Sequence, residues 1–245
     1  MRTLDLNSLF IRQFLEETLA NSDLHGHRLL DLGCGTRPYK DVYSFSHSVC
    51  IAADFDTRST IDVRLRADVL PFGDASFDTV VVTEVIEHLQ YPPKVIAEIA
   101  RVLKPAGLLV LTWPFAYSLH ELPHDYIRFT EFGMTMTLEQ HGLRVESLRR
   151  RGDMLSVLAT LVGQLLAGFG VLVTRTPVLG PFLRFLSWSC TALNNALVLV
   201  TYWSTKKSAR LYPGRPGERL SGRDQLALWT LGYCLIARKH EQGKN

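Results

Sequence analysis

The segment from residue 120 to residue 128 gathers side chains that could carry out acid–base chemistry. It reads HELPHDYIR, and its polar residues are His120, Glu121, His124, Asp125, Tyr126 and Arg128. A histidine titrates near neutral pH, so His120 or His124 could remove a proton from a hydroxyl group while Asp125 orients the imidazole. Arg128 could hold a phosphate or a carboxylate. The alternative is a self-bonded loop, in which Asp125 and Arg128 form an ion pair and Tyr126 packs.

No metal centre is expected from the sequence. The four cysteines, at positions 34, 50, 190 and 234, are scattered without CxxC spacing. This spacing disfavours a zinc site and a disulfide framework and favours a reducing compartment, so we expect a cytoplasmic protein. Two histidines and an aspartate in the segment 120–128 are suitable metal ligands, but the pattern fixes no ligand geometry.

A second functional pattern is the pair of glycines in LLDLGCGTRPYKDVY, residues 29–43. Gly33 and Gly35 come at the end of a predicted buried strand, and glycine lets the backbone approach a ligand closely. A nicotinamide or flavin fingerprint reads GxGxxG, but Pro38 stands at the place of the third glycine. The pattern is also compatible with a tight turn that has only a structural role.

Acidic residues end the next two predicted strands. Asp54 ends the strand expected at 48–54, where its carboxylate can accept hydrogen bonds from two ribose hydroxyls. Asp68 ends the strand expected at 63–68, beside Leu70–Phe72. Its carboxylate could accept from an adenine amino group while the apolar neighbours cover the ring. Asp54 could instead be a surface acid at the end of a strand.

These residues need a scaffold, and the chain alternates predicted strands with predicted helices. The expected strands are residues 28–32, 48–54, 63–68, 79–83, 108–112, 143–149 and 228–238. The expected helices are an amphipathic N-terminal helix, a helix over 85–103 interrupted near Pro92 and Pro93, and a helix from Thr130 to Gln140. Such alternation predicts an α/β fold with a parallel sheet, helices on both faces and ligands beyond the carboxyl ends of the strands.

The composition is that of a globular protein. Apolar residues make up 47% of the chain and charged residues 21%. The net charge of +3 is too small to indicate a nucleic-acid partner, so none is expected.

Two long uncharged stretches break the alternating pattern. They run from Met154 to Thr174 and from Phe185 to Trp203, and each is long enough to span a bilayer. We favour a helical cap that contacts the membrane surface. The alternatives are a transmembrane hairpin and a cap packed on the domain or on a second copy of the chain. The flanking basic residues are Arg149, Arg150, Arg151, Lys206, Lys207 and Arg210.

The C-terminal run ALWTLGYCLIARK has the pattern of a strand and is expected to be the seventh strand of the first domain. The apolar segment before it is then an insertion and not a separate tail. We therefore expect a core of residues 1–153 and 211–245, with a helical insertion at 154–210.

Taken in order, LLDLGCG, Asp54, LPFGDASFD, TEVIEHL and RVLKPAGLLVLTWP resemble the class I S-adenosylmethionine-dependent methyltransferases of the type 11 group. The resemblance covers residues 28–150 and, through the last strand, 228–238. It implies a Rossmann-like sheet of seven strands in the order 3-2-1-4-5-7-6, with the last strand antiparallel. It also implies S-adenosylmethionine as the cofactor and methyl transfer as the activity.

The resemblance also implies a role for the matching positions. Asp31, Gly33 and Gly35 would line the methionine part of the cofactor, Asp54 would hold its ribose, and Asp68 its adenine. Many relatives place the last acid four residues before the leucine of LPF, where this chain has Arg66. The expected cofactor-binding residues are Asp31, Gly33, Cys34, Gly35, Asp54, Phe55, Asp68, Val69, Thr83, Glu84 and His88.

Three residues of TEVIEHL also have a structural interpretation. Glu84 and Glu87 could sit in the first turn of a helix, where the helix dipole favours acids. His88 would lie near the transferred methyl group if the helix starts near Glu84, and could equally be a histidine on the helix surface.

The segment HELPHDYIRFT resembles that of a subset of bacterial methyltransferases, which puts it over the acceptor pocket. We therefore expect His120, His124 and Asp125 to be catalytic, and Tyr126 and Arg128 to line the pocket. Many such relatives are linked with glycan or glycolipid assembly at the cell surface. The expected acceptor is accordingly a small molecule, sugar or glycolipid that is methylated on oxygen or nitrogen.

Two other classes of function are open from the sequence. One is a catalytically silent cofactor-binding module that scaffolds a membrane-associated biosynthetic complex. The other is a nicotinamide oxidoreductase, which Pro38 opposes. The leading hypothesis is a cytoplasmic enzyme at the inner face of the membrane, with a homodimer as one arrangement of the apolar cap.

Overall fold

The computed structural model describes residues 4–19, 27–43, 49–56, 61–174, 180–205 and 229–241. The chain forms two compact units. One unit comprises residues 11–149, 211–213 and 232–245, and the other comprises residues 1–10, 150–210 and 214–231. The expected insertion at 154–210 falls within the second unit.

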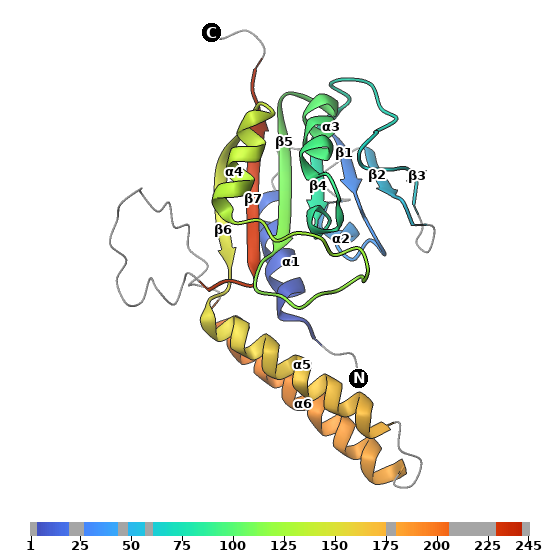
Figure 1. Ribbon diagram of the computed structural model, residues 1–245, viewed down its shortest axis with the longest axis vertical. Coiled ribbons are helices and arrows are strands. Elements are labelled where there is room, and N and C mark those ends of the chain that lie inside the picture. Colours follow the sequence, from blue (N-terminus) through green and yellow to red (C-terminus); the bar gives the residue numbers. More distant parts are fainter. Residues whose placement is uncertain are drawn as a thin grey trace, which may run out of the picture. The chain divides into compact units, whose positions relative to one another are not determined.

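The first unit is built on a seven-stranded sheet in the order β3-β2-β1-β4-β5-β7-β6 (Figure 1). Strand β7 runs antiparallel to β5, whereas β1, β2, β3, β4 and β5 pair in parallel. The strand order and the antiparallel seventh strand are confirmed. The strands are β1 (Arg28–Leu32), β2 (Val49–Asp54), β3 (Val63–Arg64), β4 (Phe77–Thr83), β5 (Leu103–Pro114), β6 (Leu143–Arg151) and β7 (Gly232–Lys239).

Several strand bounds differ by one to five residues from the sequence-based prediction, and in β3 and β5 the difference involves a turn. Strand β3 ends at Arg64 and not at Asp68, because Asp68 lies in a turn closed by the isolated bridge between Arg66 and Val69. Strand β5 starts at Leu103, earlier than predicted. The turn expected at residues 106–107 is an irregularity inside this strand, with a φ of 60° at Ala106 and a shift in the register with β4.

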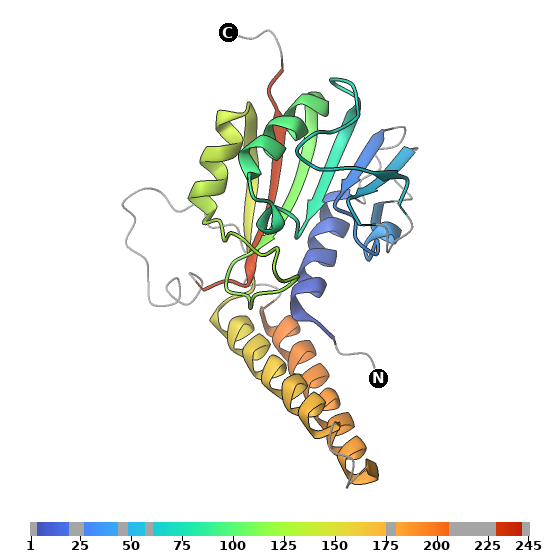
Figure 2. The same cartoon turned by 45° about the vertical axis from the view of Figure 1, so that its right-hand side comes forward.

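Strand β4 shows why the sheet carries helices on both faces. Its side chains alternate, so that Val80 and Val82 belong to one buried cluster and Val81 to another. The first cluster includes α3 (Pro92–Val102) and α4 (Glu131–Gln140), and the second includes α1 (Leu6–Leu19) from residue 11 on and α2 (Lys40–Tyr43). Figure 2 shows α3 and α4 on the same side of the sheet.

Helix boundaries follow local signals in the sequence. Thr130 caps α4 as predicted, because its hydroxyl accepts a 3.1 Å hydrogen bond from the amide of Gly133. The helix expected over 85–103 is instead two elements, a 3-10 turn η2 (Ile86–His88) and α3. Helix α3 begins at Pro92, in agreement with the predicted interruption.

The second unit contains two long helices, α5 (Met154–Thr174) and α6 (Gly180–Thr205), which lie side by side in both views (Figures 1 and 2). A Cβ atom on Gly163 would overlap the Asn194 side chain, so glycine permits a close approach of the helices. The polar pair that interrupts the second apolar stretch is buried, and Asn195 accepts a 2.8 Å hydrogen bond from the amide of Leu4. No helix among the described residues combines the length and hydropathy that a membrane crossing requires.

The basic residues beside the apolar stretches are less accessible than the sequence suggests. Arg149, at the end of the first unit, forms a 2.5 Å ion pair with Glu17. Arg151 in the second unit is only 2% exposed. Lys206, Lys207 and Arg210 lie outside the described residues. Among the described residues of α5 and α6, the exposed large apolar side chains are Leu155, Leu158, Leu161, Val162, Leu165, Trp188, Leu193, Leu199, Val200 and Trp203.

Candidate active site

The two glycines after β1 have different tasks. Both have a positive φ, 72° at Gly33 and 51° at Gly35, which is a left-handed backbone conformation that favours glycine. A Cβ atom on Gly33 would overlap the side chain of Val85. A Cβ atom on Gly35 would have no heavy atom of the described residues within 4 Å. Gly33 is thus required by packing, whereas Gly35 borders open space.

Asp54, at the carboxyl end of β2, borders the same space. Its Oδ2 accepts a 2.8 Å hydrogen bond from the amide of Gly35, and its Oδ1 accepts a 2.9 Å hydrogen bond from the amide of Asp56. A carboxylate has about four acceptor positions, so Asp54 can still accept hydrogen bonds from two hydroxyls of a ligand.

Gly35 and Asp54 border an open space, which we call the cradle. Asp31, on β1, is buried next to this cradle. Its carboxylate accepts a hydrogen bond from the hydroxyl of Tyr43. Burial nevertheless raises the pKa of Asp31 to about 6. Burial also raises the pKa of the Cys34 thiol, with the charges of Asp31 and Asp54 adding to the effect, so Cys34 is a neutral thiol. The structure brings Asp31, Gly35 and Asp54 together.

Asp68 has a different environment from the other two acids. Its carboxylate accepts hydrogen bonds from Arg66 at 3.0 Å and from Lys94 at 3.4 Å, and these bonds lower the pKa of Asp68 to about 2. Val69 beside it is 61% exposed, and Phe55 after β2 is 66% exposed. Both apolar side chains are therefore accessible to a flat apolar ligand.

The carboxyl end of β4 carries three of the predicted residues. Thr83 ends the strand opposite Thr112 of β5. Glu84 follows in a left-handed conformation with a φ of 52°, and Thr112 donates a 2.9 Å hydrogen bond to its carboxylate. His88 ends η2 and is bonded through Nδ1 to the carbonyl oxygen of His124, at 2.7 Å.

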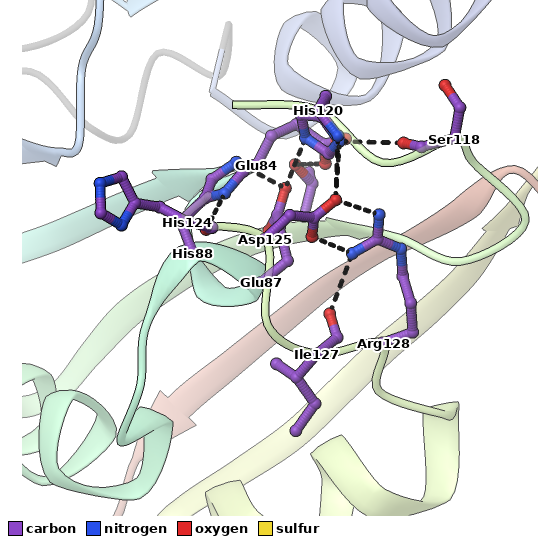
Figure 3. Close-up of polar contacts among 10 residues, drawn as sticks. Glu84, Glu87, His88, Ser118, His120, His124, Asp125, Ile127 and Arg128 are labelled. Carbon is purple, nitrogen blue, oxygen red and sulfur yellow. Dashed lines mark hydrogen bonds and ion pairs between the residues drawn. The ribbon is translucent and has the colours of Figure 1, made fainter. Parts of the chain in front are cut away.

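The segment between β5 and α4 folds over this end of β4 (Figure 3). Asp125 and Arg128 form a two-pronged ion pair, with Nη2 and Oδ2 2.7 Å apart. The guanidinium holds the pKa of Asp125 at about 2. Asp125 also orients His120, because its Oδ2 accepts the amide proton of His120 at 3.1 Å and lies 3.3 Å from Nδ1 of the ring.

The two candidate bases have different surroundings. The Nδ1 of His124 is hydrogen-bonded to the hydroxyl of Tyr126 at 3.0 Å. His120 lies instead beside Glu87, with Nε2 3.6 Å from Oε1, and the closeness of Glu87 raises the pKa of His120. The structure therefore brings His120, Asp125 and Arg128 together with η2.

Glu87 was considered in the sequence as an acid in the first turn of a helix but was not assigned to the site. Its side chain is 1% exposed, and burial raises the pKa of its carboxyl. The amides of Tyr126 and Ile127 donate to its carbonyl oxygen at 2.9 and 3.3 Å, so the loop is attached to η2 through the main chain. The only signal in the sequence is an acid between Ile86 and His88 in a mainly apolar run.

Comparisons with known proteins agree with the fold. The model of a methyltransferase domain family matches residues 30–111. The chain is 33% identical over 96 residues to a demethylmenaquinone methyltransferase of Renibacterium salmoninarum, which covers 35% of this chain and 40% of that protein. It is 29% identical over 132 residues to a ubiquinone biosynthesis O-methyltransferase of Xanthomonas oryzae pv. oryzae, which covers 46% of this chain and 55% of that protein.

A solved structure shares the fold over most of the chain. It is a putative sarcosine dimethylglycine methyltransferase from Galdieria sulphuraria, with a TM-score of 0.58 and 16% identity over 96% of this chain and 87% of that one. The curated relatives are matched over about half of their length or less. These findings support a class I methyltransferase domain of the kind that uses S-adenosylmethionine.

Proposed function

Since the chain has the class I methyltransferase fold and a matching family segment, we propose that it transfers a methyl group from S-adenosylmethionine to an oxygen or nitrogen of a small-molecule acceptor. The observation that carries the proposal is the open cradle at Gly35, bordered by the carboxylate of Asp54. S-adenosylmethionine, when bound, supplies a methyl group already activated by its sulfonium sulfur.

The cofactor roles are assigned to residues around the cradle. Asp54 accepts hydrogen bonds from the two ribose hydroxyls, and Asp31 and Gly35 border the methionine part. Asp68 accepts from the adenine amino group, while Phe55 and Val69, both exposed, cover its ring. The remaining residues assigned to the cofactor side are Gly33, Cys34, Thr83, Glu84 and His88.

His120 is assigned to the acceptor proton. Asp125 positions the imidazole of His120, and Arg128 positions Asp125. Because Arg128 is already paired with Asp125, it acts on the acceptor only through these neighbours. Tyr126, which is 44% exposed, lines the acceptor side. His124 is an alternative base that its bond to Tyr126 orients.

The acceptor class is proposed from chemistry and from the names of the relatives. Two of them are named for quinone-related methylation. A phenolic or quinol hydroxyl loses its proton more readily than an alcohol does, which suits a single histidine base. We therefore favour a phenolic or quinol acceptor, and a sugar or glycolipid is the second acceptor class.

The exposed apolar side chains of α5 and α6 support contact with a membrane surface. Such contact would put the chain at the inner face of the membrane, where lipid-soluble acceptors are found. A homodimer formed through the same side chains is the competing arrangement. The catalytically silent scaffold has no observation in its support.

Methyl transfer itself is the test of this function. The protein is incubated with methyl-labelled S-adenosylmethionine and, in parallel, with a demethylated quinol, a simple phenol and a bacterial glycolipid extract. Label should appear in the quinol or phenol, and His120→Ala should lower the rate by about 100-fold or more, the usual scale of general base catalysis. Binding of the cofactor without transfer to any acceptor class would contradict the proposal.

A further inference from the structure

The carboxylate of Glu87 faces two imidazole nitrogens without a hydrogen bond to either. Its Oε1 lies 3.6 Å from Nε2 of His88 and 3.6 Å from Nε2 of His120. Hydrogen bonds between such atoms measure about 2.7–3.2 Å. Among the described residues, neither carboxylate oxygen of this buried side chain has a hydrogen-bond partner.

Both rings are held by a contact at Nδ1, on the opposite side of the ring from the Nε2 that lies near Glu87. The Nδ1 of His88 lies 2.7 Å from the carbonyl oxygen of His124, and the Nδ1 of His120 lies 3.2 Å from the carbonyl oxygen of Ser118. A carbonyl only accepts, so each Nδ1 carries a proton, and each ring in its neutral form presents Nε2 as an acceptor. In that form three acceptor atoms face one another (Figure 3).

Such a meeting of acceptors costs free energy unless something positive lies between them. A proton would draw nitrogen and oxygen to hydrogen-bond distance. A shared metal ion, about 2.0–2.2 Å from each ligand atom at an angle near tetrahedral, holds them about 3.3–3.6 Å apart. The separations of 3.6 Å agree with the ion. We propose that Glu87, His88 and His120 bind a divalent transition-metal cation at the acceptor side of the site.

The ligand set and its supports indicate which cation this is. The three ligand atoms all lie within 4.8 Å of one another. Two imidazoles with one carboxylate suit Zn²⁺, Mn²⁺, Fe²⁺ or Co²⁺, whereas Mg²⁺ prefers oxygen ligands only. The carbonyl partners of both Nδ1 atoms, and Asp125 beside His120, are the kind of outer groups that orient metal-bound histidines.

The site is open on one side. The side chains of His88 and His120 are 20% and 28% exposed, whereas Glu87 is buried behind them. A site with three protein ligands keeps positions for water or substrate. The negative charge of Glu84 acts on Glu87 as well, so a cation offsets two carboxylates.

The use of this cation rests on the proposed function, although its binding does not. A cation held by these residues would attract the acceptor oxygen and lower the pKa of its hydroxyl, and the hydroxyl proton would pass to water. Deprotonation by the cation would replace deprotonation by the free imidazole of His120. Methyl transfer to a hydroxyl would then depend on the metal, whereas cofactor binding would not.

Cobalt titration tests the site without any turnover. The chelator-treated full chain is titrated with CoCl₂, and visible absorption is recorded. Absorption should develop and saturate at about one Co²⁺ per chain, the number implied by a single three-ligand cluster. ZnCl₂ should abolish it, and MgCl₂ at the same concentration should not. Absence of visible absorption in the wild-type chain would overturn the proposal.

The variants separate this site from adventitious histidine binding. Glu87→Gln and His120→Gln should each weaken Co²⁺ binding by at least about 100-fold, more than the loss of a group that only orients a ligand. His141→Gln is the matched control, because the Nδ1 of His141 is also 2.8 Å from a carbonyl oxygen, that of Thr137, but the ring lies outside the cluster. An equal loss of Co²⁺ binding in His141→Gln, or no loss of Co²⁺ binding in Glu87→Gln, would contradict the proposed site.

A melting experiment guards against unfolding of the variant. The amide of a glutamine at position 87 can donate to an imidazole nitrogen, which the carboxylate cannot, so metal-free Glu87→Gln should melt no lower than the metal-free wild type. Saturating Zn²⁺ should raise the Tm of the wild type only. Metal binding without methyl transfer would contradict the proposed function alone, and metal-independent transfer by a chain that does not bind Co²⁺ would contradict this inference alone.

Discussion

The amide of Gly35 donates a 2.8 Å hydrogen bond to Oδ2 of Asp54, which joins the turn after β1 to the end of β2. The bond fixes the carboxylate at the edge of the open space beside Gly35. Asp54 therefore has two tasks, to shape the turn and to receive a ligand.

We predict that Asp54→Ala weakens S-adenosylmethionine binding by about 1–3 kcal/mol, the range for hydrogen bonds to a charged group. The measurement is isothermal titration calorimetry on the folded variant. Glu146→Ala, which removes an exposed acid of β6 paired with Arg238, is the control and should bind normally. Unchanged affinity in Asp54→Ala would remove this residue from the cofactor site.

We predict that alanine mainly lowers stability at Gly33 and mainly prevents cofactor binding at Gly35. Gly33→Ala should lower the free energy of unfolding by about 1–3 kcal/mol, because the new methyl group overlaps Val85 in addition to the backbone strain. Gly35→Ala meets no described atom and should lower it by only about 1 kcal/mol, yet abolish cofactor binding. Urea unfolding and calorimetry separate the two effects.

The packing explanation for Gly33 can be checked by a second substitution. Val85→Ala removes the methyl groups that the new Cβ would overlap. The double variant Gly33→Ala/Val85→Ala should therefore lose less stability than the sum of the single variants. Strict additivity would attribute the cost at Gly33 to backbone strain alone.

We predict a pH-dependent gain in stability for Asp31→Asn. Burial raises the pKa of Asp31 from 3.8 to about 6, so the folded state binds its proton more tightly than the unfolded state does. The wild type should lose stability from this group as the pH rises from about 4 to about 6, and should not regain it at higher pH. The variant lacks this loss, which amounts to about 2–3 kcal/mol at pH 7.

Urea unfolding at a series of pH values from about 4 to 8 measures the difference. The two stability curves should separate through the window and then run parallel. Cofactor affinity should fall in the same variant, because the charge that faces the methionine part is lost. Curves that stay parallel throughout would show that Asp31 titrates normally in the folded chain.

We predict that the chain binds to vesicles through the apolar side chains of α5 and α6. Leu165 and Val200 are 74% and 68% exposed, so replacement of both by glutamate should abolish co-sedimentation with anionic vesicles. Since Arg149 is ion-paired and Arg151 is buried, salt should weaken the binding only in part.

Met136→Glu is the matched control for this experiment, because it places the same charge at a 58% exposed apolar position on α4. That variant should still sediment with vesicles. A wild-type chain that stays in the supernatant, and that elutes as a dimer separated by the double substitution, would exclude lipid and assign these side chains to a second copy.

Much of the sheet could be predicted because its signals are local. The run TVVVT needs only the two-residue period of a strand to send Val80 and Val81 to opposite faces. The Thr130 cap is equally local, and it was predicted correctly. The predicted end of β3 at residue 68 was wrong, because the bridge between Arg66 and Val69 competes with continuation of the strand.

The candidate site was only half predictable for the same reason. The turn at Gly33 and Gly35 is contiguous in sequence, and its acid partner Asp54 ends the neighbouring strand. The group formed by Glu87, His88 and His120 has no such local signal. Glu87 and His120 are distant in sequence and come together only when the loop after β5 folds back. No periodicity in TEVIEHL distinguishes a buried acid from one on the first turn of a helix.

The loop is attached at Glu87 through the main chain, whereas the chemistry of the pocket depends on the side chain of this residue. The amides of Tyr126 and Ile127 donate to the carbonyl oxygen of this residue, a group that every amino acid has. These two hydrogen bonds do not involve the Glu87 side chain. A different side chain at position 87 can therefore alter what the pocket does while the loop keeps its course. Protein engineering or evolution can therefore change the chemistry of the pocket by substitution at position 87 while the path of the loop is kept.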